Sequence, residues 1–151
     1  MKKNPALTTD EVVVAGASTK KLTDRLAEVG TLLLKSVAPD LGTGGELGAA
    51  SSITPDTGYS RIVLLGAKIA VGGSLATGES VTVRITVNYS DGSSAYIEKT
   101  YSATGDDYLT EADLQSLYKN GVGVSSIDVQ AASSATTTSA TVTVTVRGTQ
   151  F

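Results

Sequence analysis

The sequence predicts a mainly β protein: an antiparallel β-sandwich preceded by an N-terminal arm and one amphipathic helix. Apolar and polar residues alternate in several runs after Tyr59, which is typical of strands with one buried face. Glycine-rich and polar turn signals separate these runs at short intervals. Before Tyr59, leucines recur at helical spacing. An immunoglobulin-like arrangement or a small jelly roll fits this pattern.

The N-terminal region begins with a mixed arm, residues 1–17, followed by the predicted helix. Ser18 is a suitable N-cap and Pro39 ends the element. Apolar residues inside it recur at spacings of four, three and four, which is a seam of two heptads. The seam residues are Leu22, Leu26, Val29 and Leu33.

Two interpretations of this seam stay open. The helix packs on its own domain, or it mediates self-association or anchoring, for example as a short trimeric bundle. Gly30 weakens such a helix by about 1 kcal/mol, so a bundle would need support from the rest of the protein.

The chain is expected to divide into three parts. Residues 1–39 are the arm and the helix, and residues 40–58 are a Gly/Ser/Thr-rich linker. Within the linker, Leu47 and Ile53 suggest one short strand. Residues 59–151 form the sandwich, whose length is sufficient for a modest core of Val, Ile, Leu and Tyr.

Individual strands of the sandwich can be placed by their alternation. SRIVLLGAKIAVGG predicts a strand kinked or bulged at Gly66, and ESVTVRITVNY predicts a regular strand. Asp91-Gly92 predicts a hairpin that leads into SAYIEKTYSA. TEADLQSLYKNG predicts a short helix capped by Thr110 and Asp113 and closed by Gly121. The last two strands are predicted around Val124–Ala131 and Ala140–Arg147.

The final strand contains SATVTVTVRG, in which valine and threonine alternate. Val142, Val144 and Val146 are predicted to face the core. The opposite face carries Thr141, Thr143 and Thr145, and threonine is a β-branched residue that favours strands and tolerates water. We expect this face to be a solvated wall, or to pack against a neighbouring subunit.

The composition excludes several classes of chemistry. The chain has no cysteine, histidine or tryptophan, which removes Cys/His zinc sites, His-based triads and thiol nucleophiles. The net charge of −3 gives no basic field for nucleic acid. No carboxylate pair is placed for catalysis, so the sequence predicts no enzyme and no cofactor.

The sequence shows no export signal and no membrane span. The N-terminus MKKNPALTTDEVVV lacks an apolar stretch of signal-peptide length, and no run approaches the length of a membrane span. We therefore expect a soluble protein made in the cytoplasm without export, and no membrane partner.

Acidic residues in loops are the candidates for a calcium site. They are Asp91, Asp106, Asp107 and Glu111, and no D-x-D-x-D-G spacing accompanies them. Solvated turn residues explain them better, and no metal site is predicted. The glycines of LGTGGELG likewise lack the context of a phosphate-binding loop.

Tyrosines are the candidates for carbohydrate binding. Tyr96 is on the strand face opposite Ile97 and is predicted to be an exposed surface contact. Core packing or interface burial is the commoner role of such residues. The full set is Tyr89, Tyr96, Tyr101, Tyr108 and Tyr118.

The overall layout resembles virion structural proteins of tailed phages, of the capsid decoration or head-fibre type. The stretches that carry the resemblance are STKKLTDRLAEVGTLLLKS, ESVTVRITVNYSDGSSAYIEKTYSA and SATVTVTVRG. The resemblance implies a virion location after assembly in the host cytoplasm. It also implies a homo-oligomer, often a trimer, that contacts other virion proteins such as a major capsid protein.

Two other classes of function remain alternatives. A carbohydrate-binding or adhesive surface module would use an exposed cluster around Tyr96. A pilus or surface-layer subunit would require an export route, for which the N-terminus shows no signal.

Overall fold

The computed structural model describes residues 11–12, 20–21 and 30–151. Near the N-terminus, β1 (Glu11–Val12) pairs antiparallel with β2 (Lys20–Lys21). The remaining elements are β3 (Thr31–Val37), β4 (Leu41–Gly42), β5 (Ser51–Ile53), β6 (Ile62–Ser74), β7 (Val81–Tyr89), β8 (Ser94–Tyr101), β9 (Gly105–Leu109), the 3-10 helix η1 (Gln115–Leu117), β10 (Val124–Ser133) and β11 (Ser139–Gln150).

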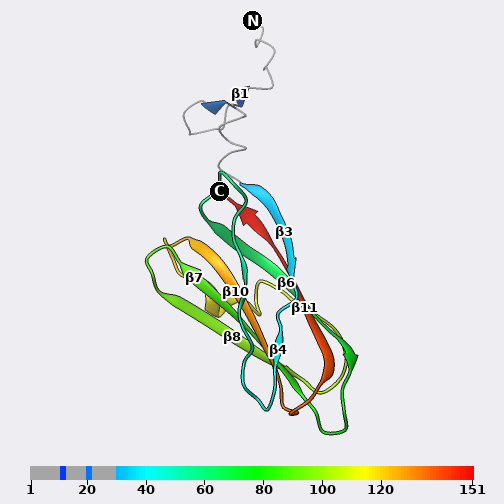
Figure 1. Ribbon diagram of the computed structural model, residues 1–151. Helices are drawn as coiled ribbons and strands as arrows, with labels where there is room; N and C mark the ends of the chain where they lie inside the picture. The colour runs from blue at the N-terminus through cyan, green and yellow to red at the C-terminus, as the bar shows by residue number, and fades with distance from the viewer. Residues whose placement is uncertain (1–10, 13–19, 22–29) are drawn as a thin grey trace, which may run out of the picture.

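The strands from β3 onward form one hydrogen-bonded path that curls into two layers (Figure 1). One layer has the order β3-β11-β6-β9, and the other has β8-β7-β10 with β5 and β4 beside β10. A single residue pair, Val124 with Ile62, joins the layers. The architecture is therefore a two-layer antiparallel sandwich, and the only parallel pair in the described residues is the short one between β4 and β10.

The pairing is nested along the chain. β3 pairs with β11, β5 with β10, β6 with β9, and β7 with β8. The nested pairs are then linked laterally, because β11 also pairs with β6 and β10 also pairs with β7. This is a long antiparallel hairpin rolled onto itself, which is the jelly-roll type of sandwich rather than the immunoglobulin-like one.

Strict alternation places the core between the layers. Every second residue of β7 is buried, from Val81 to Tyr89, and Val142, Val144 and Val146 of β11 are buried in the same way. Ile69 and Val71 of β6 belong to the same apolar cluster. The predicted core faces of these strands are confirmed, and a two-residue period explains them.

The predicted kink at Gly66 is confirmed as a bulge. Arg147 of β11 pairs with Gly66, while the next residue, Gly148, pairs with Leu64, so Leu65 is the extra residue. At this point a Cβ on Gly148 would lie 2.3 Å from the carbonyl oxygen of Val63, so only glycine fits. The bulge turns Leu65 and Lys68 to the same outer face of the strand.

The predicted helix over residues 18–39 is wrong where the structure describes it. Residues 31–37 form β3, which pairs with β11 along its whole length. Gly30 has a φ of +76°, and a Cβ there would lie 2.9 Å from the Phe151 ring, so the backbone enters β3 through a conformation that suits glycine. Pairing with β11 and burial of Leu33 outweigh the helical spacing of the leucines, which is a weak local preference.

The predicted linker, residues 40–58, is also wrong as a boundary between domains. β4 and β5 pair with β10, and Ile53 is buried in the core. Gly42 and Gly48 lie so close to neighbouring backbone that a Cβ on either would clash. Gly42 and Gly48 therefore serve close packing in this segment, and β3 to β5 belong to the sandwich.

The predicted helix over residues 110–121 is reduced to turns and the three-residue η1. The expected cap contact is present, because the Thr110 backbone N–H and hydroxyl both donate to the Asp113 carboxylate, at 2.8 and 2.9 Å. Gly121 has a φ of +74°, as a closing glycine does.

The assignment of β3 makes a direct prediction on stability. Leu33 is 1% exposed, so Leu33→Ala should lower the free energy of unfolding by about 2–5 kcal/mol. The matched substitution Leu34→Ala removes a side chain that is 62% exposed and should change it by no more than about 0.5 kcal/mol. Urea denaturation of dilute protein measures both, and equal losses at the two positions would contradict the strand assignment.

Candidate functional site

The outer face of the β3-β11-β6-β9 layer carries exposed apolar side chains. Leu32 and Leu34 of β3 are 65% and 62% exposed, because the residues that alternate with them face the core. Val63 pairs through Thr149 with Leu32, so the two apolar side chains belong to one row across three strands. We call this surface the leucine face and define it by Leu32, Leu34, Val63, Leu65 and Tyr108.

A hollow of about 760 Å³ lies on the leucine face. Leu34, Leu65 and Tyr108 line it, and Tyr108 is 68% exposed. Arg147 and Thr145 of β11 line it as well. Part of the predicted threonine wall is therefore the floor of a concave surface.

Charged groups of both signs border this hollow. Lys68 forms an ion pair of 3.0 Å with Asp106 and lies 5.6 Å from the ring centre of Tyr108. The Asp106 carboxylate, which accepts a hydrogen bond from the ammonium group, raises the pKa of Lys68. Glu111 lies on the β9 side of the hollow. The leucine face thus combines apolar side chains with paired opposite charges.

The outer face of the other layer is polar. Arg84 donates to the Glu98 carboxylate from Nε at 2.8 Å, and its guanidinium lies 4.4 Å from the ring centre of Tyr96. Tyr96 is 57% exposed, as its position opposite Ile97 indicates. Asn88 donates to Ser126 and Asp128, so most polar groups of this face are bonded to one another.

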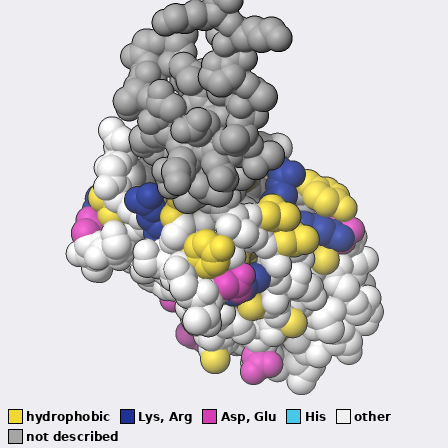
Figure 2. Space-filling view, turned by 90° about the horizontal axis from the view of Figure 1, so that it is seen from above, with side chains coloured by type: hydrophobic (Ala, Val, Ile, Leu, Met, Phe, Trp, Pro, Cys, Tyr) yellow, Lys and Arg dark blue, Asp and Glu magenta, His cyan; other side chains and the backbone are white. Residues whose placement is uncertain are grey.

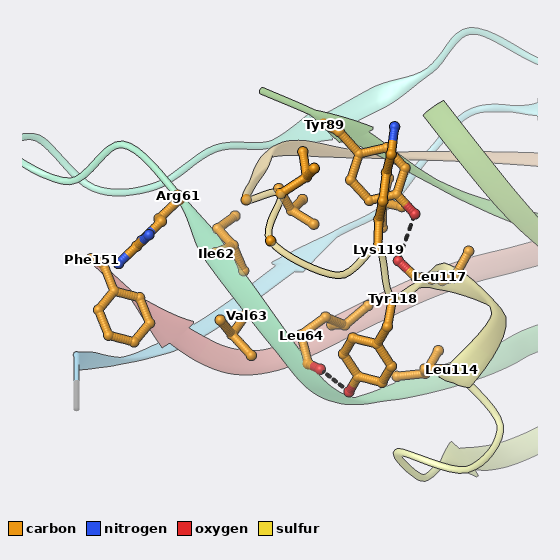
Figure 3. Close-up of a pocket in the computed structure, with 15 residues that line it drawn as sticks. Arg61, Ile62, Val63, Leu64, Tyr89, Leu114, Leu117, Tyr118, Lys119 and Phe151 are labelled. Carbon is orange, nitrogen blue, oxygen red and sulfur yellow. Dashed lines mark hydrogen bonds between the residues drawn. The ribbon is translucent and has the colours of Figure 1, made fainter. Parts of the chain in front are cut away.

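A second concavity, of about 420 Å³, lies where β6 and β10 meet (Figure 3). The hydroxyl of Tyr89 donates to the Leu117 carbonyl at 2.6 Å, and that of Tyr118 donates to the Leu64 carbonyl at 2.5 Å. Arg61 stacks on the Phe151 ring, 4.9 Å from its centre. Both hydroxyls are used to hold the loop that contains η1, so they fix structure at this end.

Figure 2 looks onto the end of the molecule where the C-terminus lies. Hydrophobic side chains gather there in small groups beside lysine and arginine side chains. Lys119, which lines the concavity where β6 and β10 meet, forms an ion pair of 2.5 Å with Asp91. Bonds from Lys119 and Ser93 hold the pKa of Asp91 well below its usual range.

The predicted acidic candidates do not converge on a cation. Asp91 pairs with Lys119, Asp106 pairs with Lys68, and Asp107 accepts a hydrogen bond of 2.8 Å from the Tyr101 hydroxyl. Burial and this carboxylate raise the pKa of Tyr101. Within the described residues, no group of three acidic side chains is placed to hold a metal ion.

Glu79 is a buried carboxylate that sequence analysis did not single out. It is 5% exposed and accepts hydrogen bonds from Ser133 at 2.6 Å, Thr138 at 2.5 Å and the Ala76 backbone N–H at 2.7 Å. These donors lower the pKa of Glu79. The carboxylate fastens the β6–β7 turn to the β10–β11 turn, and no local motif marks such a long-range contact.

The predicted oligomerisation residues are placed only in part. Leu22, Leu26 and Val29 lie outside the described residues. Leu33 is buried in the core of the sandwich. The apolar side chains that the structure exposes at this point are its neighbours Leu32 and Leu34.

Comparisons with known proteins give little further information. No protein-family model and no curated protein matches the chain. A solved chain from Desmodium yellow mottle tymovirus is similar with a TM-score of 0.36 and 11% identity, over 99% of this chain and 97% of that one. Among the described residues, no helix has the length and apolar character needed to cross a membrane.

The Glu79 contacts predict a pH dependence. Because the folded-state pKa of Glu79 lies below the ordinary value of 4.5, the stabilisation is complete above that pH and is lost as the pH falls through the folded-state value. Glu79→Gln should lower the midpoint temperature of thermal unfolding at pH 7. Below pH 4.5, this temperature should fall less steeply in the variant than in the wild-type protein. Thermal melts from pH 7 to pH 2.5 measure this, with Glu46→Gln as a surface control. If the midpoint temperature of Glu79→Gln fell below pH 4.5 as steeply as that of the wild-type protein, the prediction would be contradicted.

Proposed function

We propose that this chain is a non-enzymatic virion structural protein of the capsid decoration or head-fibre type, which self-associates and binds a viral protein lattice. The observation that carries the proposal is the leucine face. Two leucines more than 60% exposed on one sheet face are unusual for a protein that works alone, and such patches mark contact surfaces.

The architecture supports the same proposal. Jelly rolls occur in viral capsid domains, in lectins and in cupins, so the fold is compatible with a virion role but does not select it. A sandwich with two outer faces of different character can make two different contacts. The leucine face suits the contact between copies of the chain, and the polar face around Tyr96 suits contacts with other virion proteins.

The arrangement of charged groups supports a role without catalysis. In the described residues, Asp56, Asp91, Asp106 and Glu98 each form an ion pair with a lysine or arginine. The buried carboxylate of Glu79 is bonded to three donors. Groups held in this way stabilise turns and strands, whereas a general acid or base needs a proton that substrate can reach.

An adhesive or carbohydrate-binding module is the second candidate, and Tyr96 favours it. An exposed aromatic ring beside Arg84 and Glu98 offers an apolar surface and hydrogen-bonding groups to a sugar. Arg84 already covers one side of the ring, which reduces the surface left for a ligand.

The virion role predicts where the protein is found. Particles purified on a density gradient from the cells that express the gene should contain this chain in fixed ratio to a major capsid protein. Quantitative mass spectrometry of gradient fractions measures the ratio. A chain present only in the soluble fractions, with particles free of it, would overturn the proposal.

The adhesive alternative has its own test. A glycan array probed with the full chain should show binding that Tyr96→Ala abolishes and Tyr108→Ala, an exposed tyrosine on the opposite layer, leaves intact. An array on which the wild-type chain binds no glycan would remove this candidate.

A further inference from the structure

We propose that the leucine face is covered by the leucine face of a second copy of this chain, so that two sandwiches pack face to face. The inference rests on the proposed function, whose self-association it makes specific. It identifies the contact surface and the partner, and it leaves the polar face around Tyr96 free on both copies.

The edges of the layers argue against the other simple mode of association, pairing of strands between copies. β3 and β8 are the terminal strands of the hydrogen-bonded path. Lys35 of β3 lies on the core side of its strand, alternating with Leu33, and Lys99 of β8 lies on the core side opposite Val83. Inward-pointing charges on edge strands are a common device against edge-to-edge pairing. Pairing between copies is therefore disfavoured at these two edges, which favours a face as the contact surface.

The leucine face is self-complementary in shape. It carries the exposed side chain of Leu32 and, beside it, a hollow of about 760 Å³ lined by Leu34, Tyr108 and Arg147. A twofold interface requires that one surface supply both the projecting group and its receptor. A second copy satisfies this requirement, because Leu32 of each copy can enter the hollow of the other.

The charges of the face are compatible with a second copy. Lys68 and Arg147 provide positive charge, while Asp106 and Glu111 provide negative charge toward the β9 side. Two identical faces with both signs can meet with opposite charges adjacent, whereas a face of one sign would repel its copy.

The area is close to that of a small stable interface. The four strands of this layer hold 37 residues in all. At about 3.3 Å per residue and a strand spacing of about 4.8 Å, each residue covers about 16 Å² of the face. The face therefore covers about 590 Å², near the lower end of the roughly 600–1,000 Å² per partner of a standard interface. Sheets that pack face to face lie about 10 Å apart, which a crosslinker spans easily.

Single-cysteine crosslinking tests the face directly, because the chain has no native cysteine. Thr143→Cys places a thiol on the outer side of β11, and the control Thr100→Cys places one on the exposed outer side of β8 in the other layer. With a flexible bis-maleimide, Thr143→Cys should form covalent dimers at least tenfold more efficiently than Thr100→Cys. Equal or lower efficiency at Thr143→Cys would overturn the proposal.

A second variant tests the side chains that drive the contact. Leu32→Glu with Leu34→Glu, added to Thr143→Cys, should abolish the crosslink while the circular dichroism melt shows a folded protein. A crosslink that persists in this folded variant would overturn the proposal; if the variant does not fold, the comparison of Thr143→Cys with Thr100→Cys decides. Particles that contain the chain while Thr143→Cys fails to crosslink would overturn face pairing and leave the virion role intact.

Discussion

The pairing of β11 with β3 on one side and β6 on the other is the constraint on which the structure depends. β11 closes the rolled hairpin, because it joins β3, the first strand of the sandwich, to β6. Its alternation fixes the inside and the outside of the whole layer, because a shift of one residue would place valines in water and threonines in the core. Gly148 and the extra residue Leu65 hold that register at the bulge.

The two outer faces follow from this register. On the β3-β11-β6-β9 layer, pairing brings Leu32 into one row with Val63 and brings Leu34 beside Arg147. On the other layer, the corresponding positions hold Arg84 and Glu98, which form an ion pair, and Asp128, which accepts a hydrogen bond from Asn88. The outer face of the β3-β11-β6-β9 layer therefore exposes apolar side chains to solvent. On the outer face of the other layer, most polar groups are bonded to neighbouring side chains. This difference, rather than any catalytic group, is the functional information in the described part of the molecule.

Sequence analysis predicted the strands whose period is regular. β6 with its bulge, β7, the hairpin to β8, β10 and β11 follow from alternation and from Asp91-Gly92. β3 was missed because Leu32, Leu33 and Leu34 are consecutive, so the run has no two-residue period. The helical spacing of Leu26, Val29 and Leu33 then decided the interpretation. Pairing with β11, which lies more than a hundred positions away, cannot be inferred from the local sequence.

Of the two outer faces, sequence analysis identified a candidate residue only on the polar one. Tyr96 was identified because a regular strand places it opposite Ile97. The leucine face combines residues of four strands, and Tyr108 belongs to β9, a strand with acidic residues that no apolar alternation marks. Likewise, the glycines of residues 40–58 suggested a linker by composition, and only the close approach of Gly42 and Gly48 to neighbouring backbone shows why glycine is needed at those two positions.

The central claim is that this sandwich associates through its apolar face. Sedimentation equilibrium of the full-length wild-type chain, over a wide range of protein concentration, tests it most directly. The account predicts a reversible equilibrium whose limiting species has twice the mass of the chain, with association strengthened by a salt such as sulfate, which favours apolar burial. A single species of monomer mass at every concentration would contradict it.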